Sequence, residues 1–471
     1  MGLFTTKQIP VTPLSINNLS QKQKYEKLEA YYNNNDLYDD LTRLAYQNSY
    51  YMEVMKPLRN PCHSSVEFYA AKIFGSEAVQ INTKNQQVKD TLELVHKWSN
   101  MQSIKTIASR NLALYGDIFI RVAKKGNKVY QELINPKLVT DFTTDNRGNL
   151  LTIRIDQKLK DDLGQTYWYT EYWEKGDNGY YAIWEHRLGE NANLEQLPEP
   201  IESGYLSEFG IDFIPIVHAS FTATDNTRGK SSFFHALSKI DESNRQASRL
   251  HQMLFRNNKP LWVSTSSNVD KDGKFKAPPL TSGQKIDATD NSILSMPNMT
   301  DIKSLVPDVK YADALAIVQA QVEEVEKDLP EIRYFALKDN GLSGKALRTL
   351  LGSAVDRANE ARSGLVSAFI RADEIALTIG MAAGIFSGLG SYENGDFDHS
   401  YILPDIFPVN LDDIALTLQS LKNAGLPLSS ALKMIGKDDE FIAEVEAQLQ
   451  ADLQRNQDSL GVAMQRFNYG G

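Results

Sequence analysis

The chain has 471 residues, which is too long for one ordinary hydrophobic core and suits two to four substructures. Hydrophobic residues make up 42% and charged residues 23%, which excludes disorder over most of the length, and the single cysteine excludes an intrachain disulfide. The net charge of −10 argues against a protein that grips DNA phosphates tightly, although an acidic wall would let DNA slide past.

Neither a targeting segment nor a membrane span is expected. The first ten residues lack the apolar core of a secretory signal. The longest apolar stretch, 375–389, is shorter than the roughly 20 residues needed to cross a bilayer, so it predicts a buried helix. The lone thiol of Cys62 fits a reducing compartment. We therefore expect a cytosolic protein with no membrane contact.

Apolar residues at helical spacing predict the elements of the first part of the chain. Residues 1–20 are polar and are expected to be flexible. Ser64 or Ser65 is the expected N-cap of the third helix, and Trp98 is the expected apolar anchor between the last two. The expected helices cover 21–32, 37–47, 61–75 and, as a pair, 86–114.

The pattern then changes to alternation, which predicts antiparallel strands over 117–220. Three turns interrupt it: Lys125-Gly126-Asn127, the DNRG sequence at 145–148, and Asp177-Asn178-Gly179. The apolar segment 214–221 is the expected last strand. Aromatic residues are dense over 167–184; packing within the sheet is the interpretation we favour, and base stacking is the alternative.

The second half of the chain predicts two long helices around a small excursion. A helix over 231–259 ends at Pro260, the segment 260–309 is rich in turn residues, and a helix over 310–330 ends at Pro330. Together these elements would form a stalk with a tip. The rest is expected as a loop at 331–342, a long helix over 343–386 capped by Ser343 and kinked at Gly352 or Gly364, an extended piece to 410, small helices over 411–460, and a flexible end at 461–471.

Catalytic motifs are weak or incomplete. Gly344-Lys345 resembles part of a phosphate loop, but Asp339 and Ala346 occupy positions that need a glycine and a hydroxyl residue, so a helix start is the better interpretation. The segment 268–273 resembles half of a calcium loop, but Pro279 stands where a bidentate glutamate is required. No zinc spacing or nucleophile elbow occurs. We expect no cofactor, no metal and no enzymatic activity.

An excess of acids marks the predicted helix near 311–331. A solvated helix face is one explanation. The other is that the helix borders the hole of a ring, where each acid would be repeated around the axis and would keep DNA from sticking. The acids are Asp313, Glu323, Glu324, Glu326, Asp328 and Glu331, against Lys310 and Lys327.

The order of these parts resembles the portal proteins, or head-to-tail connectors, of tailed double-stranded DNA bacteriophages, of the long-tailed siphovirus-like type. The strongest match is 213–263, where an Ile-Pro-Ile-Val strand at 214–217 leads through Gly229 into a helix with Asn244 near its middle. The segment 339–351 is similar through Ser343–Leu347, and 111–122 through its Tyr-Gly pair. The matches, in order, cover about 25–460. One departure is the polar linker 222–230, where the family often has a hydrophobic residue followed by glycine.

The resemblance implies an α+β, portal-type ring subunit with a helical and β wing, a two-helix stem, a small β-rich clip, a long wing helix and a helical crown. The implied parts are the wing at 21–230, the first stem helix at 231–259, the clip at 260–309, the second stem helix at 310–330, the tunnel loop at 331–342, the long wing helix and strand at 343–410, and the crown at 411–460.

The implied function is a dodecameric channel at one vertex of the virion capsid, used for DNA packaging, retention and ejection and assembled in the host cytoplasm. The implied partners are other copies of the chain, the terminase large subunit, then a head–tail adaptor, the major capsid protein, and double-stranded DNA held non-specifically. Twelve and thirteen subunits both stay open for purified rings. The implied DNA-channel residues are Arg333, Lys338, Asp339, Glu323, Glu324 and Glu326, and the implied clip residues for partner docking are Lys271, Lys274, Phe275 and Lys276.

Two other classes of function stay open. Another oligomeric virion protein or minor head protein would lack the order of strand, helix, clip, helix, loop and helix. A nucleic-acid-processing enzyme would need a nucleotide-binding loop or clustered metal-binding carboxylates, and neither motif is present in the sequence.

Overall fold

The computed structural model has a mixed α+β fold and divides into two compact units. The first consists of Met1–Phe335 and Ser353–Pro404, and the second of Ala336–Gly352 and Asp405–Gly471. The described residues are 20–34, 60–175, 181–194, 197–205, 213–222, 228–257, 262–265, 271–272, 293–294, 301–304, 311–338, 344–407, 411–434, 441–451 and 454–455.

Four helices among the described residues form the start of the first unit. Ser20 and Gln23 close a capping box at the first, and the side chain of Asn85 caps the third. The expected helix at 37–47 lies outside the described residues. The helices are α1 (Gln21–Asn33), α3 (Cys62–Lys72), α4 (Gln86–Ser99) and α5 (Met101–Tyr115).

One detail of these helices was predicted wrongly. The N-cap of α3 is Pro61, with no side-chain hydrogen bond, because Ser65 is buried and bonds to distant residues instead. The ring of Trp98, the expected anchor between α4 and α5, stacks on Phe386, with ring centroids 6.2 Å apart.

The strands of this region form two antiparallel sheets. The first has the order β3-β2-β9 and the second the order β4-β5-β6-β7-β8. A core of Phe119, Ile153, Ile155, Trp173 and Ile216 joins them. The strands are β2 (Asp117–Lys125), β3 (Lys128–Ile134), β4 (Val139–Thr144), β5 (Leu150–Lys160), β6 (Thr166–Lys175), β7 (Tyr181–Gly189), β8 (Glu202–Tyr205) and β9 (Ile216–Ser220), with a short 3-10 helix, η3 (Pro136–Leu138), before β4.

The predicted turns at 125–127 and 145–148 lie between paired strands, with Gly126 and Gly148 at positive φ where a side chain would be strained. The turn expected at 177–179 lies outside the described residues. A further small sheet pairs β1 (Gln80–Asn82) with β13 (Ser400–Ile402), preceded by the 3-10 helix η7 (Tyr392–Asn394), and so ties the end of the first unit to its beginning.

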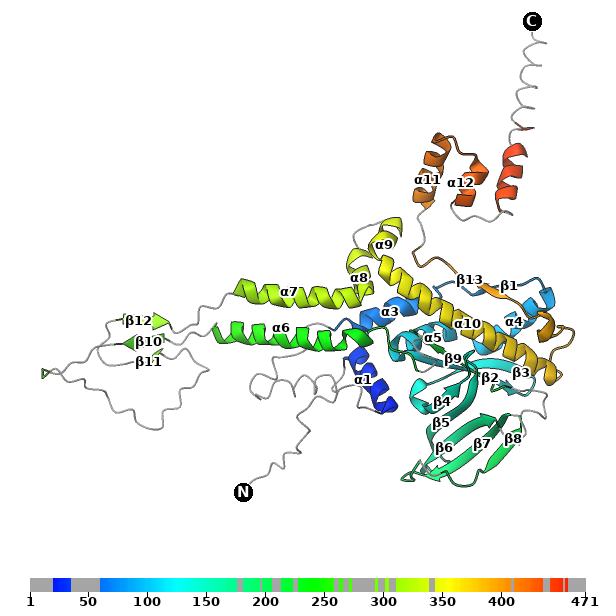
Figure 1. Ribbon diagram of the computed structural model, residues 1–471, viewed down its shortest axis with the longest axis horizontal. Helices are drawn as coiled ribbons and strands as arrows, with labels where there is room; N and C mark the ends of the chain where they lie inside the picture. Colours follow the sequence, from blue (N-terminus) through cyan, green and yellow to red (C-terminus); the bar gives the residue numbers. More distant parts are fainter. Residues whose placement is uncertain are drawn as a thin grey trace, which may run out of the picture. The chain divides into compact units, whose positions relative to one another are not determined.

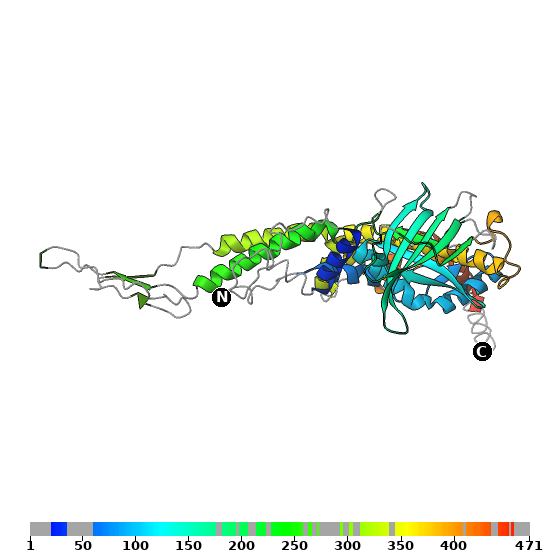
Figure 2. The same cartoon turned by 90° about the horizontal axis from the view of Figure 1, so that it is seen from below.

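Two long helices and a few short strands make the arm. The helices α6 and α7 lie side by side in both views, with the strands beyond their far ends (Figures 1 and 2). Strand β10 pairs with β11 in parallel and with β12 in antiparallel orientation. The elements are η5 (Phe234–Ala236), α6 (Leu237–Asn257), β10 (Trp262–Thr265), β11 (Ile293–Leu294), β12 (Asp301–Ser304), α7 (Tyr311–Asp328), η6 (Pro330–Ile332) and α8 (Arg333–Lys338).

The structure corrects three predicted boundaries. The helix expected from 231 begins at Leu237, after the 3-10 turn η5, and before that turn the backbone N–H of Ser232 donates to the carbonyl oxygen of Ala113. The segment expected as a loop over 331–342 is helical over Arg333–Lys338, where neither glycine nor proline interrupts it. The helix expected to run on from 343 is interrupted at Leu351, before Gly352; α9 (Gly344–Leu350) precedes the break and α10 (Gly352–Ala382) follows it, with Gly364 inside.

The second unit contains small helices. Gly425, at positive φ, ends α11, and the chain turns there into α12. Within this unit Arg348 reaches the carbonyl oxygen of Phe407 and the carboxylate of Asp405. The helices are α11 (Leu411–Asn423), α12 (Leu428–Met434) and a helix at 441–451. Among the described residues of the whole chain, no helix is both long and apolar enough to cross a membrane.

Candidate functional site: a two-helix arm and its buried anchor

The two arm helices are joined by an ion pair near the base of the arm. The Nζ atom of Lys239 in α6 lies 2.8 Å from a carboxylate oxygen of Asp328 in α7 and 3.8 Å from one of Glu324. At the beginning of α6, the side chains of Leu237 and Ile240 are buried. Since α7 follows 53 intervening residues later, this contact brings together helices that are distant in sequence.

Helix α7 keeps apolar surface exposed. Among its described side chains only Val325 is buried. Leu315 is 49% exposed and Ile317 is 57% exposed. Residues two positions apart point to nearly opposite sides of a helix. A single neighbouring helix therefore leaves apolar side chains of α7 without cover, and a further surface would be needed to bury them.

A buried carboxylate anchors the arm to the body of the first unit. Glu331, in η6 just after α7, has no exposed surface. Its Oε2 atom lies 3.0 Å from a guanidinium nitrogen of Arg357 in α10, and Ser65 in α3 donates its hydroxyl to Oε1. The hydroxyl oxygens of Ser65 and Ser232 lie 3.1 Å apart. The anchor thus joins α3, α10, η6 and the residues before α6.

Arg357 contacts both segments of the chain at the base of the arm, where α7 ends and where the residues before α6 begin. Its guanidinium donates to the carbonyl oxygen of Asp328 at 2.9 Å, where α7 ends, and to that of Ser232 at 2.5 Å, just before η5 and α6. Burial raises the pKa of Glu331, and the charge of Arg357 opposes that rise. A buried ion pair of this kind fixes the geometry of the groups that it joins, because either partner alone would be costly to bury.

The acids predicted to border a channel are largely paired. Glu323 is exposed. Glu324 bonds Lys327 in the next turn, and Glu326 lies 3.1 Å from Arg333. Glu331 was wrongly counted with this acidic face, since it lies inside the protein. The surface of α7 near its end therefore carries mixed charges rather than bare acids.

The other predicted site residues are only partly described. The structure brings Arg333 to Glu326, and Lys271 lies in an exposed turn. The backbone of Lys338 belongs to α8, but its side chain lies outside the described part, as do Asp339, Lys274, Phe275 and Lys276. The structure therefore brings Glu326 and Arg333 together and gives no geometry for the expected docking group.

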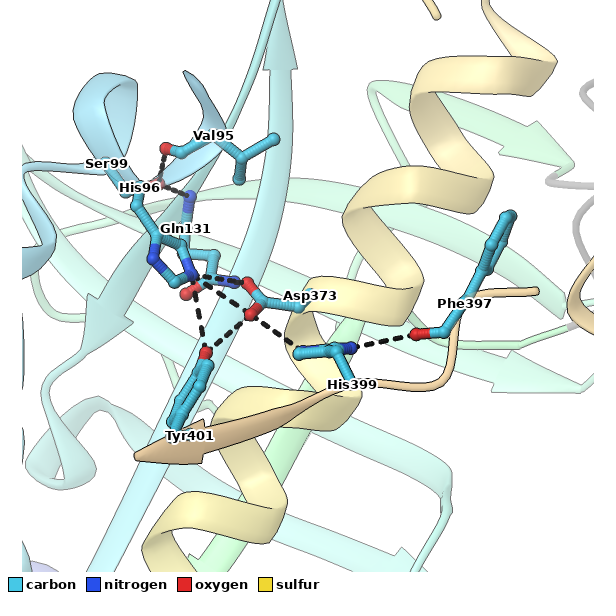
Figure 3. Close-up of polar contacts among 8 residues, drawn as sticks. All are labelled: Val95, His96, Ser99, Gln131, Asp373, Phe397, His399 and Tyr401. Atoms are coloured by element: carbon cyan, nitrogen blue, oxygen red, sulfur yellow. Dashed lines mark hydrogen bonds and ion pairs between the residues drawn. The ribbon is translucent and has the colours of Figure 1, made fainter. Parts of the chain in front are cut away.

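A second buried polar cluster was missed by sequence reasoning (Figure 3). Asp373 in α10 lies 3.0 Å from Nε2 of His96 in α4 and 3.2 Å from Nε2 of His399, and it accepts hydrogen bonds from Gln131 in β3 and Tyr401 in β13. The members come from four separate segments, so no local pattern could have revealed the cluster.

The cluster is organised for cohesion rather than catalysis. Burial by itself would raise the pKa of Asp373, but His96 and His399 hold it well below its usual range. Both imidazoles direct Nε2 at the same buried carboxylate, which leaves no accessible base beside a nucleophile. Among the described residues, no group of three or more acidic, histidine or cysteine side chains has an arrangement that could hold a metal ion.

The cluster predicts a pH-dependent contribution to stability. Burial lowers the pKa of His399, but the hydrogen bond and charge of Asp373 raise it above its usual value of about 6.5. The stabilising effect of protonated His399 is therefore complete below about pH 6.5, and it is lost as pH rises through the folded-state pKa of His399. We expect His399→Gln to lower the melting temperature more at pH 6 than at pH 9. The same change at the exposed His235 is the control, and an equal loss at both pH values would contradict the prediction.

No family model matches the chain, and no curated protein matches it. The chain is similar to a chain in the neck of a native GTA particle with C12 symmetry, at 13% identity and a TM-score of 0.38; 83% of this chain and 93% of that chain are covered. It is also similar to a chain in the neck of an empty GTA particle with C6 symmetry, at 12% identity and a TM-score of 0.40, with the same coverage.

Proposed function

We propose that this chain is a portal-type subunit that assembles into a ring around a DNA channel. The observation that carries the proposal is the arm: two long helices with short strands beyond their ends, held at the base by the Glu331–Arg357 pair. The apolar surface that α6 leaves exposed on α7 fits a second copy of the arm. Contact between different faces of successive copies closes into a ring when the rotation allows it.

The charges of the arm suit passage of DNA rather than tight binding. A net charge of −10 disfavours retention of a polyanion, and the pairs of Glu324 with Lys327 and Glu326 with Arg333 leave few cations free at this part of the arm. In this proposal Glu323, Glu326 and Arg333 face the channel. The strands beyond α6 and α7, with Lys271, meet the packaging motor and later the adaptor at the capsid vertex.

The proposal makes the chain a structural channel without catalysis of its own. Two assays separate it from a motor or a nuclease: purified protein should neither hydrolyse ATP nor cut DNA. The alternative of another oligomeric virion protein is separated by images of the purified full chain in projection, together with its mass in solution. We expect closed rings with a central hole and a mass about twelve times that of the 52.9 kDa chain. A monomeric particle would overturn the proposal.

The arm surface can be tested with one substitution. Ile317→Asp should abolish ring formation at concentrations where the unchanged protein is fully assembled, because full burial of an isoleucine side chain is worth about 1.5–3 kcal/mol in each interface. The side chain is exposed within the single chain, so the fold should survive. Ile201→Asp, at a position that is 64% exposed before β8, is the matched control and should leave the rings intact. Rings formed equally by both variants would remove α7 from the interface.

A further inference from the structure

Residues 228–230, at the end of the polar segment 222–230, line a cavity of about 650 Å³. Helix α1, the end of β4 and residues 228–234 surround it. Arg228 and Lys230 come from the linker, and Lys24 comes from α1. The one acid among the lining residues is Asp141, which is exposed. Three cations therefore gather around one cavity of a protein whose net charge is −10.

Two glycines, Gly116 and Gly229, let the backbone at 229–230 pack closely against the body of the first unit. A Cβ atom added to Gly229 would lie 2.1 Å from the carbonyl oxygen of Gly116, and one added to Gly116 would lie 2.5 Å from the carbonyl carbon of Lys230. The backbone N–H of Gly229 donates to the buried carboxylate of Asp117 at 2.8 Å. Because the backbone of Gly229 and Lys230 packs directly on Gly116, at the junction of α5 and β2, the side chains of Arg228 and Lys230 extend from a well-packed backbone.

The three cations are not equivalent. Arg228 is already engaged: it donates to the hydroxyl of Tyr25 and to the carbonyl oxygens of Val139 and Thr140. Lys24 and Lys230 differ, since neither has a carboxylate within 4.0 Å among the described residues. The ammonium of Lys230 lies 5.7 Å from the ring centre of Phe234. Two half-buried lysine residues at the cavity thus lack a counter-ion in the described part of the chain.

An orphaned hydroxyl lies in the same wall. Ser231 is 3% exposed, and its Oγ atom has no hydrogen-bond partner among the described residues. A buried hydroxyl without a partner costs free energy that a ligand oxygen would recover. Aromatic residues complete the lining, among them Tyr25, Tyr115, Phe142 and Phe234. Cations and a hydroxyl suit a phosphate, and aromatic rings suit the flat face of a base.

We propose that this cavity binds a phosphate-bearing ligand of the nucleotide class, with Lys24 and Lys230 as the phosphate contacts and Ser231 as a further donor. The ligand chemistry has two sources, a free mononucleotide or the end of a nucleic acid strand. The site belongs to the first unit alone and does not depend on ring assembly or on the arm. If the chain formed no rings, the proposed ligand site would be unaffected. If the cavity bound no ligand, the proposed ring would be unaffected.

The test is a binding titration of the full chain, followed by fluorescence anisotropy. The probes are a labelled adenosine monophosphate and a labelled ten-nucleotide single strand, each at 50 and 200 mM salt. The double variant Lys24→Ala/Lys230→Ala should bind the preferred probe at least tenfold more weakly. With the single-stranded probe, the double variant should make the negative slope of log affinity against log salt less steep by about 1.4, because each lost phosphate contact removes about 0.7. Lys125→Ala/Lys128→Ala, at the exposed β2–β3 turn, removes the same charge and should bind like the unchanged protein.

A third variant separates binding from folding. Ser231→Ala removes the orphaned hydroxyl, so it should weaken binding of the probe without lowering the melting temperature. Binding of the mononucleotide identifies the free ligand, and binding of the strand alone identifies nucleic acid; either supports the proposal. No binding of either probe would overturn it. So would equal affinity of the two double variants, or tighter binding of an acidic peptide than of both phosphate probes.

Discussion

Replacing Arg357 with alanine lowers the free energy of unfolding of the first unit by about 3 kcal/mol, the largest effect that we expect at the arm. The change leaves the fully buried carboxylate of Glu331 without its counter-ion and removes the hydrogen bonds to Asp328 and Ser232. Urea unfolding at a fixed protein concentration measures it, because assembly would otherwise add its own contribution. The exposed Arg147 is the control, and Arg147→Ala should change stability by less than about 0.5 kcal/mol.

The same variant has a defined pH dependence. Burial already raises the pKa of Glu331, and loss of Arg357 removes the charge that opposes this rise. A carboxyl whose folded-state pKa is raised loses stability as pH rises through that pKa, so the variant should recover towards the unchanged protein between pH 8 and pH 5. Adding Glu331→Gln to Arg357→Ala should also recover part of the loss. If the difference in unfolding free energy between the Arg357→Ala variant and the unchanged protein depended neither on pH nor on Glu331→Gln, the ion pair would be contradicted.

Replacing Asp373 with alanine costs about 3–5 kcal/mol, because the buried side chains of His96, Gln131, His399 and Tyr401 all lose their common acceptor. The loss should open the contact between β1 and β13, and proteolysis near residue 400 should report it. Asp162→Ala, at an exposed position, is the matched control and should be nearly neutral. If the free energy of unfolding fell by less than about 1 kcal/mol, the cluster would not be an important source of stability.

Asp373→Asn isolates the charge in the same cluster. Because His96 and His399 lower the pKa of Asp373, its ionised form stabilises the fold above about pH 3.8, and that contribution is lost as pH falls through the folded-state pKa. The asparagine variant lacks this dependence. The difference in stability between the two proteins should therefore stay constant above about pH 5 and shrink as pH falls below about 3.8, which thermal unfolding at several pH values would follow.

The elements set by neighbouring residues were predictable from the sequence. The β2–β3 hairpin follows from alternation around Gly126, and α4 and α5 follow from apolar spacing. The two arm helices and the short strands between them follow from long uninterrupted helical patterns on either side of a segment rich in turn residues. Each depends on periods of two or 3.6 residues, which are local properties of the chain.

The tertiary structure decided which polar residues are buried and what they contact. Glu331 belongs by spacing to the acids of α7, yet it lies inside because Ser65 and Arg357, 266 and 26 residues away in sequence, converge on it. Asp373 is likewise surrounded by partners from other elements, and Lys24 of α1 lines the same cavity as Lys230 only in the folded chain. Such contacts join residues without a common period, so the free energy that selects them is that of packing and charge pairing in the whole first unit, and no short stretch of the chain encodes it.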